Sequence, residues 1–61
     1  MGTVLQASTS LTGRLWTRLV FVEPDGAMHV LSAWKPVKTM ASAKREAYCY
    51  GAALEVTEGQ Q

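Results

Sequence analysis

The chain has 61 residues, of which 48% are hydrophobic and 18% are charged, and its formal net charge is +1. This length suffices for one small domain, which buries only about 60% of the surface that its unfolded chain exposes. The charge is too small to indicate nucleic-acid binding by bulk electrostatics. Cys49 is the single cysteine and His29 the single histidine, which excludes an intrachain disulfide and leaves too few ligands for a structural zinc site. We therefore expect stability to come from self-association or from a partner.

Composition also predicts a compartment. A single free thiol is typical of a reducing, intracellular setting. Residues 1–10 lack a basic segment followed by an apolar one, and the longest apolar runs are far shorter than the roughly 20 residues of a membrane span. The absence of asparagine and isoleucine, with eight alanines, indicates a GC-rich genome. We expect a cytoplasmic protein of a bacterial host cell, encoded by a bacterium or its phage, with no membrane contact.

The first part of the chain predicts an arm followed by a hairpin. Residues 1–13 are rich in Ser, Thr and Gly, and we interpret them as a flexible arm or one short extra strand, with the ordered core beginning near Arg14. Residues 15–23 are almost all strand formers. Pro24-Asp25-Gly26 has the composition of a three-residue hairpin loop, a type I turn closed by a bulge. Residues 28–34 form the return strand, which Pro36 ends because proline cannot donate to the ladder.

The second part predicts a helix and a last strand. Residues 40–50 form a helix with Thr39 as N-cap and Gly51 as C-cap. A short strand follows over residues 52–57, with Leu54 and Val56 on one face. The predicted core stripe of the helix is Met40, Ala43, Ala47 and Tyr50.

These elements make residues 14–61 a single α+β binding domain. It is a small β-β-α-β domain with an antiparallel sheet packed on one helix, and residues 58–61 form a polar tail. If Glu23 faces Ala27, the turn fixes the register of the hairpin. One face then carries the pairs Val22–Met28, Val20–Val30, Arg18–Ser32 and Trp16–Trp34. The other face carries Phe21–His29, Leu19–Leu31, Thr17–Ala33 and Leu15–Lys35.

In a sheet with one solvated face, apolar and polar residues alternate along each strand. The two strands of this hairpin do not show that alternation, so both of its faces are partly apolar. One helix covers one face, so a second apolar face is left over, and such patches usually mark interaction sites. Three arrangements could cover it: residues 1–13, a homodimer formed through the sheet, or a different protein. We expect a homodimer that also binds a host protein or protein complex. A subunit that folds only within a larger assembly is a further alternative.

Residues that could carry out chemistry are few. His29 is predicted to be a structural histidine beside Phe21, and Cys49 a semi-buried residue off the core stripe. The five acids are dispersed, so no pair is set for acid–base catalysis. We predict no enzyme activity, catalytic residue, cofactor, metal or small-molecule substrate.

Nucleic-acid binding is the second hypothesis, because small sheets can dock into DNA grooves and aromatic side chains can stack on bases. The chain has six basic and five acidic residues, and this density of basic residues is lower than that of the basic stripe of a typical nucleic-acid-binding protein. The basic residues are Arg14, Arg18, Lys35, Lys38, Lys44 and Arg45. The aromatic residues that could stack are Trp16, Trp34, Tyr48 and Tyr50.

The arrangement over residues 15–57 resembles the short coliphage inhibitor of bacterial RNA polymerase. The shared elements are Leu15-Trp16-Thr17, Thr39-Met40, the aromatic helix end at residues 48–50, and Glu55-Val56-Thr57. The chain departs from that family in two places. Glu58-Gly59-Gln60 stands where the family has arginines that contact the polymerase, and Lys44 and Arg45 stand in a helix that is acidic in the family.

Ala43-Lys44-Arg45, followed by Gly51 and an apolar strand, is similar to some small anti-CRISPR proteins. Both resemblances imply a small, non-catalytic phage protein that occupies a functional surface of a host machine and inhibits it. We therefore expect two groups of partner-binding residues. The first is Trp16, Arg18, Val20, Ser32 and Trp34 on one sheet face, and the second is Lys44, Arg45 and Tyr48 on the exposed side of the helix. If the other sheet face is outward, Phe21, Leu19 and Leu31 take the place of the first group.

Overall fold

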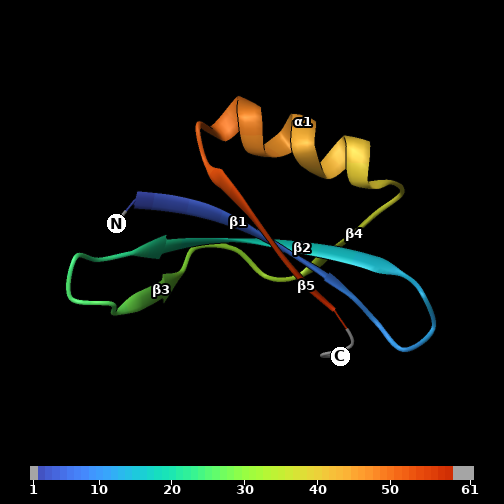
Figure 1. Cartoon of the computed structure of the whole chain (residues 1–61), viewed down its shortest axis with the longest axis horizontal. Helices are drawn as coiled ribbons and strands as arrows, with labels where there is room; N and C mark the ends of the chain where they lie inside the picture. The colour runs from blue at the N-terminus through green and yellow to red at the C-terminus, as the bar shows by residue number, and fades with distance from the viewer. Residues whose placement is uncertain (1, 59–61) are drawn as a thin grey trace.

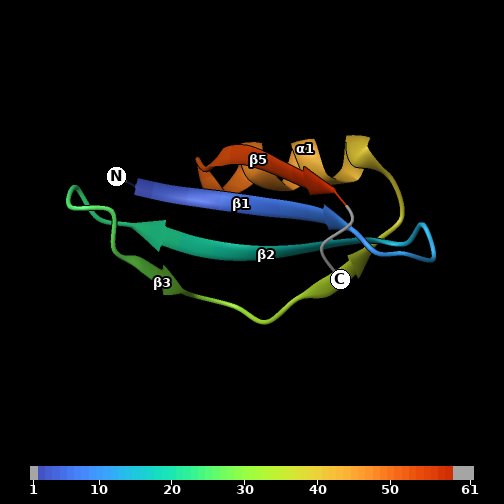
Figure 2. The same ribbon diagram turned by 60° about the horizontal axis from the view of Figure 1, so that its bottom comes forward.

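The computed structural model describes residues 2–58 and has two layers, a mixed five-stranded sheet and one helix (Figure 1). The strand order is β3-β2-β1-β5, and β4 pairs with β2 as β3 does (Figure 2). The predicted class, a small α+β domain, is confirmed. The elements are β1 (Gly2–Thr9), β2 (Leu15–Val22), β3 (Met28–Val30), β4 (Lys35–Val37), α1 (Met40–Tyr50) and β5 (Ala53–Glu58).

Strand β1 lies in the middle of the sheet. It pairs antiparallel with β2 over all eight of its residues and parallel with β5 from Val4 to Thr9. The alternative of an extra strand is therefore the right one for residues 2–9, and the expectation that the ordered core begins near Arg14 is wrong. The expectation of a purely antiparallel sheet is wrong as well, because the chain crosses over from β4 through α1 and returns parallel to β1.

The hairpin between β2 and β3 forms as predicted. The Glu23 amide donates to the Ala27 carbonyl at 2.8 Å, and Gly26 has a φ of +95°, which favours glycine. The Asp25 carboxylate accepts from the Ala27 amide at 2.9 Å. The predicted register is confirmed for Val20–Val30 and for the two pairs that follow it toward the turn.

Beyond Val30 the predicted return strand is interrupted. The amides of Leu31 and Ser32 both donate to the Leu19 carbonyl, at 2.8 and 3.2 Å, and the Ser32 hydroxyl accepts from the Leu19 amide at 3.0 Å. This local arrangement shifts the register by two residues, so that Trp16 lies opposite Pro36 in β4. The predicted Trp16–Trp34 pair is therefore wrong. Pro36 lies inside a strand rather than after one, and the sheet tolerates it because β4 is an edge strand.

Helix α1 has the predicted bounds and caps. The Thr39 hydroxyl accepts from the Ser42 amide at 3.1 Å, and Gly51 ends the helix with a φ of 66°. Of the predicted core stripe, Ala43 and Ala47 are buried, Met40 is half-buried, and Tyr50 is 54% exposed. The helix therefore contacts the sheet mainly through two alanines.

A side-chain contact between the two layers shows which sheet face the helix covers. The Thr17 hydroxyl donates to Glu46 Oε1 of α1 at 3.3 Å. Because side chains alternate along a strand, Thr17 and Leu19 lie on this helix face, and Arg18 lies on the opposite face. We call the opposite side the open face. Trp16 and Arg18 therefore lie away from the helix, as the first predicted contact group requires.

An ion pair between Lys35 and Glu46 joins β4 to α1. The hydrogen bond from Lys35 to Glu46 is the largest cause that raises the pKa of Lys35 above its usual 10.5, and the negative charge of Glu46 is the second. The ion pair therefore contributes its full stabilisation of the fold below the pKa that Lys35 has in the unfolded chain. This contribution is lost as the pH rises through the higher pKa of Lys35 in the folded protein. Between about pH 10 and 12 we expect the wild type to lose more stability than Lys35→Arg, because arginine stays protonated there. Denaturant midpoints across this range measure the difference, and equal losses would contradict it.

Candidate functional site: the hairpin and the open face

Exposed large apolar side chains gather on the hairpin formed by β2 and β3. Phe21 is 39% exposed, Met28 48%, and Val30 and Leu31 each 54%. We call these four residues the hairpin surface. Helix α1 packs mainly against β1, β4 and β5, and the hairpin tip extends beyond it (Figures 1 and 2). Met28 and Val30 lie on the open face and Phe21 on the helix face, so the hairpin is apolar on both sides.

A polar network lies beside the hairpin surface on the open face. Arg18 Nε donates to Gln6 Oε1 at 2.6 Å, and Gln6 Nε2 donates to Glu55 Oε1 at 2.9 Å. These contacts link β2, β1 and β5. The Arg18 guanidinium carbon also lies 4.7 Å from the centroid of the Trp34 ring, which is within the range of a cation–π contact. The network therefore holds a tryptophan and an arginine in place on this face.

The structure separates the two groups of predicted contact residues. Trp16, Arg18 and Trp34 are half-buried on the open face, beside the exposed Ser32. Val20 lies on the open face as well, but it is fully buried and offers no surface to a partner. Lys44, Arg45 and Tyr48 are exposed on α1, on the other side of the sheet. One flat partner surface cannot contact both groups.

Sequence reasoning missed Gln6 and Glu55, which complete the network around Arg18. Gln6 falls in the segment interpreted as an arm, and Glu55 is an ordinary polar residue of an edge strand. Only the pairing of Gln6 with Arg18 on one side and Glu55 on the other brings these three side chains together. No local pattern in the sequence could have indicated this contact.

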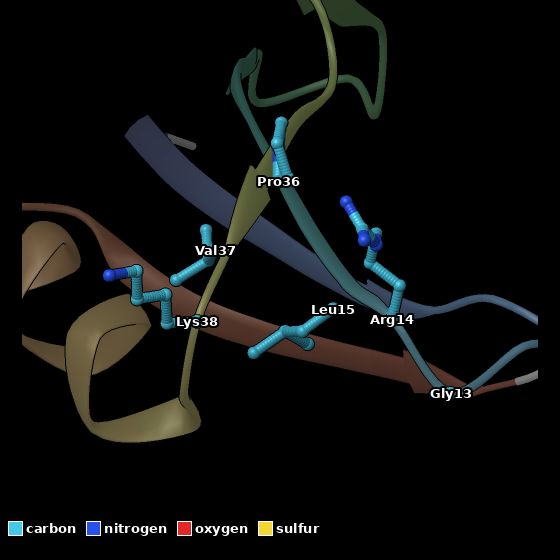
Figure 3. A pocket seen from close by; sticks show the side chains of 6 residues that line it. All are labelled: Gly13, Arg14, Leu15, Pro36, Val37 and Lys38. Atoms are coloured by element: carbon cyan, nitrogen blue, oxygen red, sulfur yellow. The ribbon is translucent and has the colours of Figure 1, made fainter.

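An open pocket of about 560 Å³ lies between the start of β2 and β4 (Figure 3). Its lining residues are Gly13, Arg14, Leu15, Pro36, Val37 and Lys38. Arg14 and Lys38 are exposed, and their side chains extend in different directions (Figure 3). The pocket therefore offers two separate cations around an apolar floor rather than a converging site for one anion.

The histidine and the cysteine considered for chemistry lie on different elements, His29 on β3 and Cys49 on α1. His29 Nε2 lies 2.5 Å from Glu23 Oε2 in an exposed contact at the hairpin. Cys49 is exposed on α1, so the prediction that it is semi-buried is wrong. Within residues 2–58, no three His, Cys, Asp or Glu side chains are grouped so that they could hold a metal ion.

Comparison with protein families, characterised proteins and solved structures finds no match to this chain. In the part of the chain that the structure describes, no helix is long and apolar enough to cross a membrane.

Proposed function

We propose that this chain is a small non-catalytic protein that binds another protein through the hairpin surface and the adjoining open face. The observation that carries the proposal is the exposure of all four large apolar side chains of the hairpin surface, between 39% and 54%. Covering apolar surface contributes about 25 cal/mol per Å². For a domain this small, the free energy gained when a partner covers the hairpin surface is comparable to the free energy of unfolding of the whole domain.

Trp34 and Arg18, on the open face beside the hairpin surface, are of the residue types that commonly contribute most of the binding energy at an interface. Tryptophan and arginine are enriched among the few interface residues whose truncation costs most. Here the arginine is already held by Gln6 and stacked against the Trp34 ring. Side chains that are ordered before binding lose less conformational entropy when a partner docks.

The contacts of the basic residues favour a protein over a nucleic acid as partner. Arg18 contacts Gln6 and Trp34, and Lys35 forms an ion pair with Glu46. Two of the six basic residues considered for nucleic-acid binding are therefore engaged within the fold. The exposed apolar side chains of the hairpin suit a protein surface better than a phosphate backbone, which is recognised mainly by cations.

We further propose that the partner is a host protein complex and that binding inhibits it, in the manner of small phage inhibitors of RNA polymerase or of CRISPR effector complexes. Support comes from the resemblance over residues 15–57 and from the small size of the domain. Such a protein acts by occupying a functional surface, which requires a rigid apolar contact area and no chemistry of its own.

Affinity capture and activity measurements test this function. The tagged full chain is used to capture proteins from nuclease-treated bacterial lysate, and the captured complex is then purified and assayed for activity with added chain. The test variant is the double substitution Met28→Ser/Val30→Ser, which changes only exposed side chains of the hairpin surface. We expect the wild type to retain and inhibit one complex and the variant to lose both effects. Binding that disappears with nuclease and weakens steeply with salt would instead identify a nucleic-acid binder.

A further inference from the structure

The apolar core of this domain is unusually small. In the part of the chain that the structure describes, five apolar residues are buried, and three of them are alanines: Leu5, Ala7, Val20, Ala43 and Ala47. Small domains with so little core usually gain stability from disulfides, metals or oligomerisation. A single cysteine excludes an intrachain disulfide. The chain therefore has a physical reason to bury more surface against another chain.

The two edges of the sheet differ in how open they are to such pairing. On one edge, β3 and β4 have three residues each, are separated by the irregular segment 31–34, and include Pro36. Short strands, irregular pairing and proline all protect an edge against further pairing. On the other edge, β5 has six residues, Ala53–Glu58, without proline or lysine. Among residues 2–58 it pairs with β1 only and lies at the edge of the sheet (Figure 2), so its outer backbone groups are free to pair.

We propose that a second copy of this chain pairs antiparallel with β5, which joins the two sheets across a twofold axis at Val56. An axis perpendicular to the sheet keeps every residue on its own face, so Val56 lies opposite Val56 of the other copy and Glu55 lies opposite Thr57. An axis at Glu55 would place two glutamates directly opposite each other, which is destabilising. An axis at Leu54 would leave residues 56 to 58 without strand partners.

A second copy is favoured over a strand of another protein, because one pairing then covers Val56 and hydrogen-bonds the outer backbone groups of β5 in both chains. Val56 is 50% exposed, and the symmetric arrangement covers it in both copies. The backbone groups of β5 become paired in both copies at the same time. The hairpin surface lies at the opposite edge of the sheet and stays free, so the inference is independent of the proposed function. A dimer of this form presents two hairpin surfaces at its two ends.

A cysteine crosslink tests the register directly. Residues directly opposite in an antiparallel pair have Cα atoms about 4.5–5.5 Å apart, which is within the range of a disulfide. In full-length chain carrying Cys49→Ser, we expect Val56→Cys to give a covalent dimer on mild oxidation. The matched control is Val30→Cys on the other edge, since Val30 is 54% exposed and also a strand valine. A covalent dimer with Val30→Cys and none with Val56→Cys would overturn the placement.

Light scattering after gel filtration, over a dilution series, tests the dimer itself. We expect the wild type to be a dimer, and Val56→Lys to raise its dissociation constant at least tenfold because two ammonium groups then lie opposite each other. Val30→Lys should leave the dimer intact. A wild type that is monomeric at every concentration, or equal effects of the two lysines, would overturn the proposal. Capture of the target by monomeric Val56→Lys would show that the proposed function stands apart from dimerisation.

Discussion

Leu5→Ala is expected to unfold much of the protein at room temperature. Leu5 is 1% exposed and lies between Leu19 on β2 and Leu54 on β5. Truncation of a fully buried leucine costs about 2–5 kcal/mol, through lost burial and the cavity that remains. A single core in a domain of this size rarely supplies more than about 3–5 kcal/mol. The substitution therefore removes most of the available stability.

Urea denaturation followed by circular dichroism measures this loss. The matched control is Leu11→Ala, because Leu11 lies in the turn between β1 and β2 and is 84% exposed. We expect the control to change the free energy of unfolding by less than about 0.5 kcal/mol. If the two variants unfold at the same urea concentration, β1 is not the central strand of the core.

Trp34→Ala is expected to weaken binding to the captured target by at least about 30-fold, the effect of losing about 2 kcal/mol at an interface hot spot. Trp34 is half-buried, and its ring lies against the Arg18 guanidinium next to the hairpin surface. Its removal deletes apolar contact area and also removes one of the two contacts that hold Arg18, the other being Gln6. Both effects lower affinity in the proposed binding mode.

Calorimetric titration of the target with each variant measures the change. Tyr48→Ala is the control, because Tyr48 is 86% exposed on α1 on the other side of the sheet. We expect Tyr48→Ala to change affinity less than about threefold and Trp34→Phe to restore part of the loss, since a ring remains over Arg18. A large effect of Tyr48→Ala with none for Trp34→Ala would place the partner on the helix side.

Part of the candidate site could be predicted from the sequence. The apolar character of both faces of the hairpin followed from the register that the turn sets. Which face meets the helix stayed open in the sequence, and the contact between Thr17 and Glu46 decides it. The contact of Trp34 with Arg18 was not predicted, because the register shifts by two residues between β3 and β4, in the segment where the Leu19 amide donates to the Ser32 hydroxyl. The burial of Val20 also depends on packing from neighbouring strands.

The sequence by itself determined the elements whose contacts are local. The Pro24-Asp25-Gly26 turn, the bounds of α1 and its caps at Thr39 and Gly51 rest on residues a few positions apart, so composition and spacing predicted them. Only the tertiary structure decided the role of residues 2–9. The partners of β1 are Leu15–Val22 and Ala53–Glu58, and the second of these lies at the far end of the chain. A strand whose hydrogen bonds and apolar contacts all come from distant segments leaves no local pattern, and its Ser, Thr and Gly content resembles that of a loop.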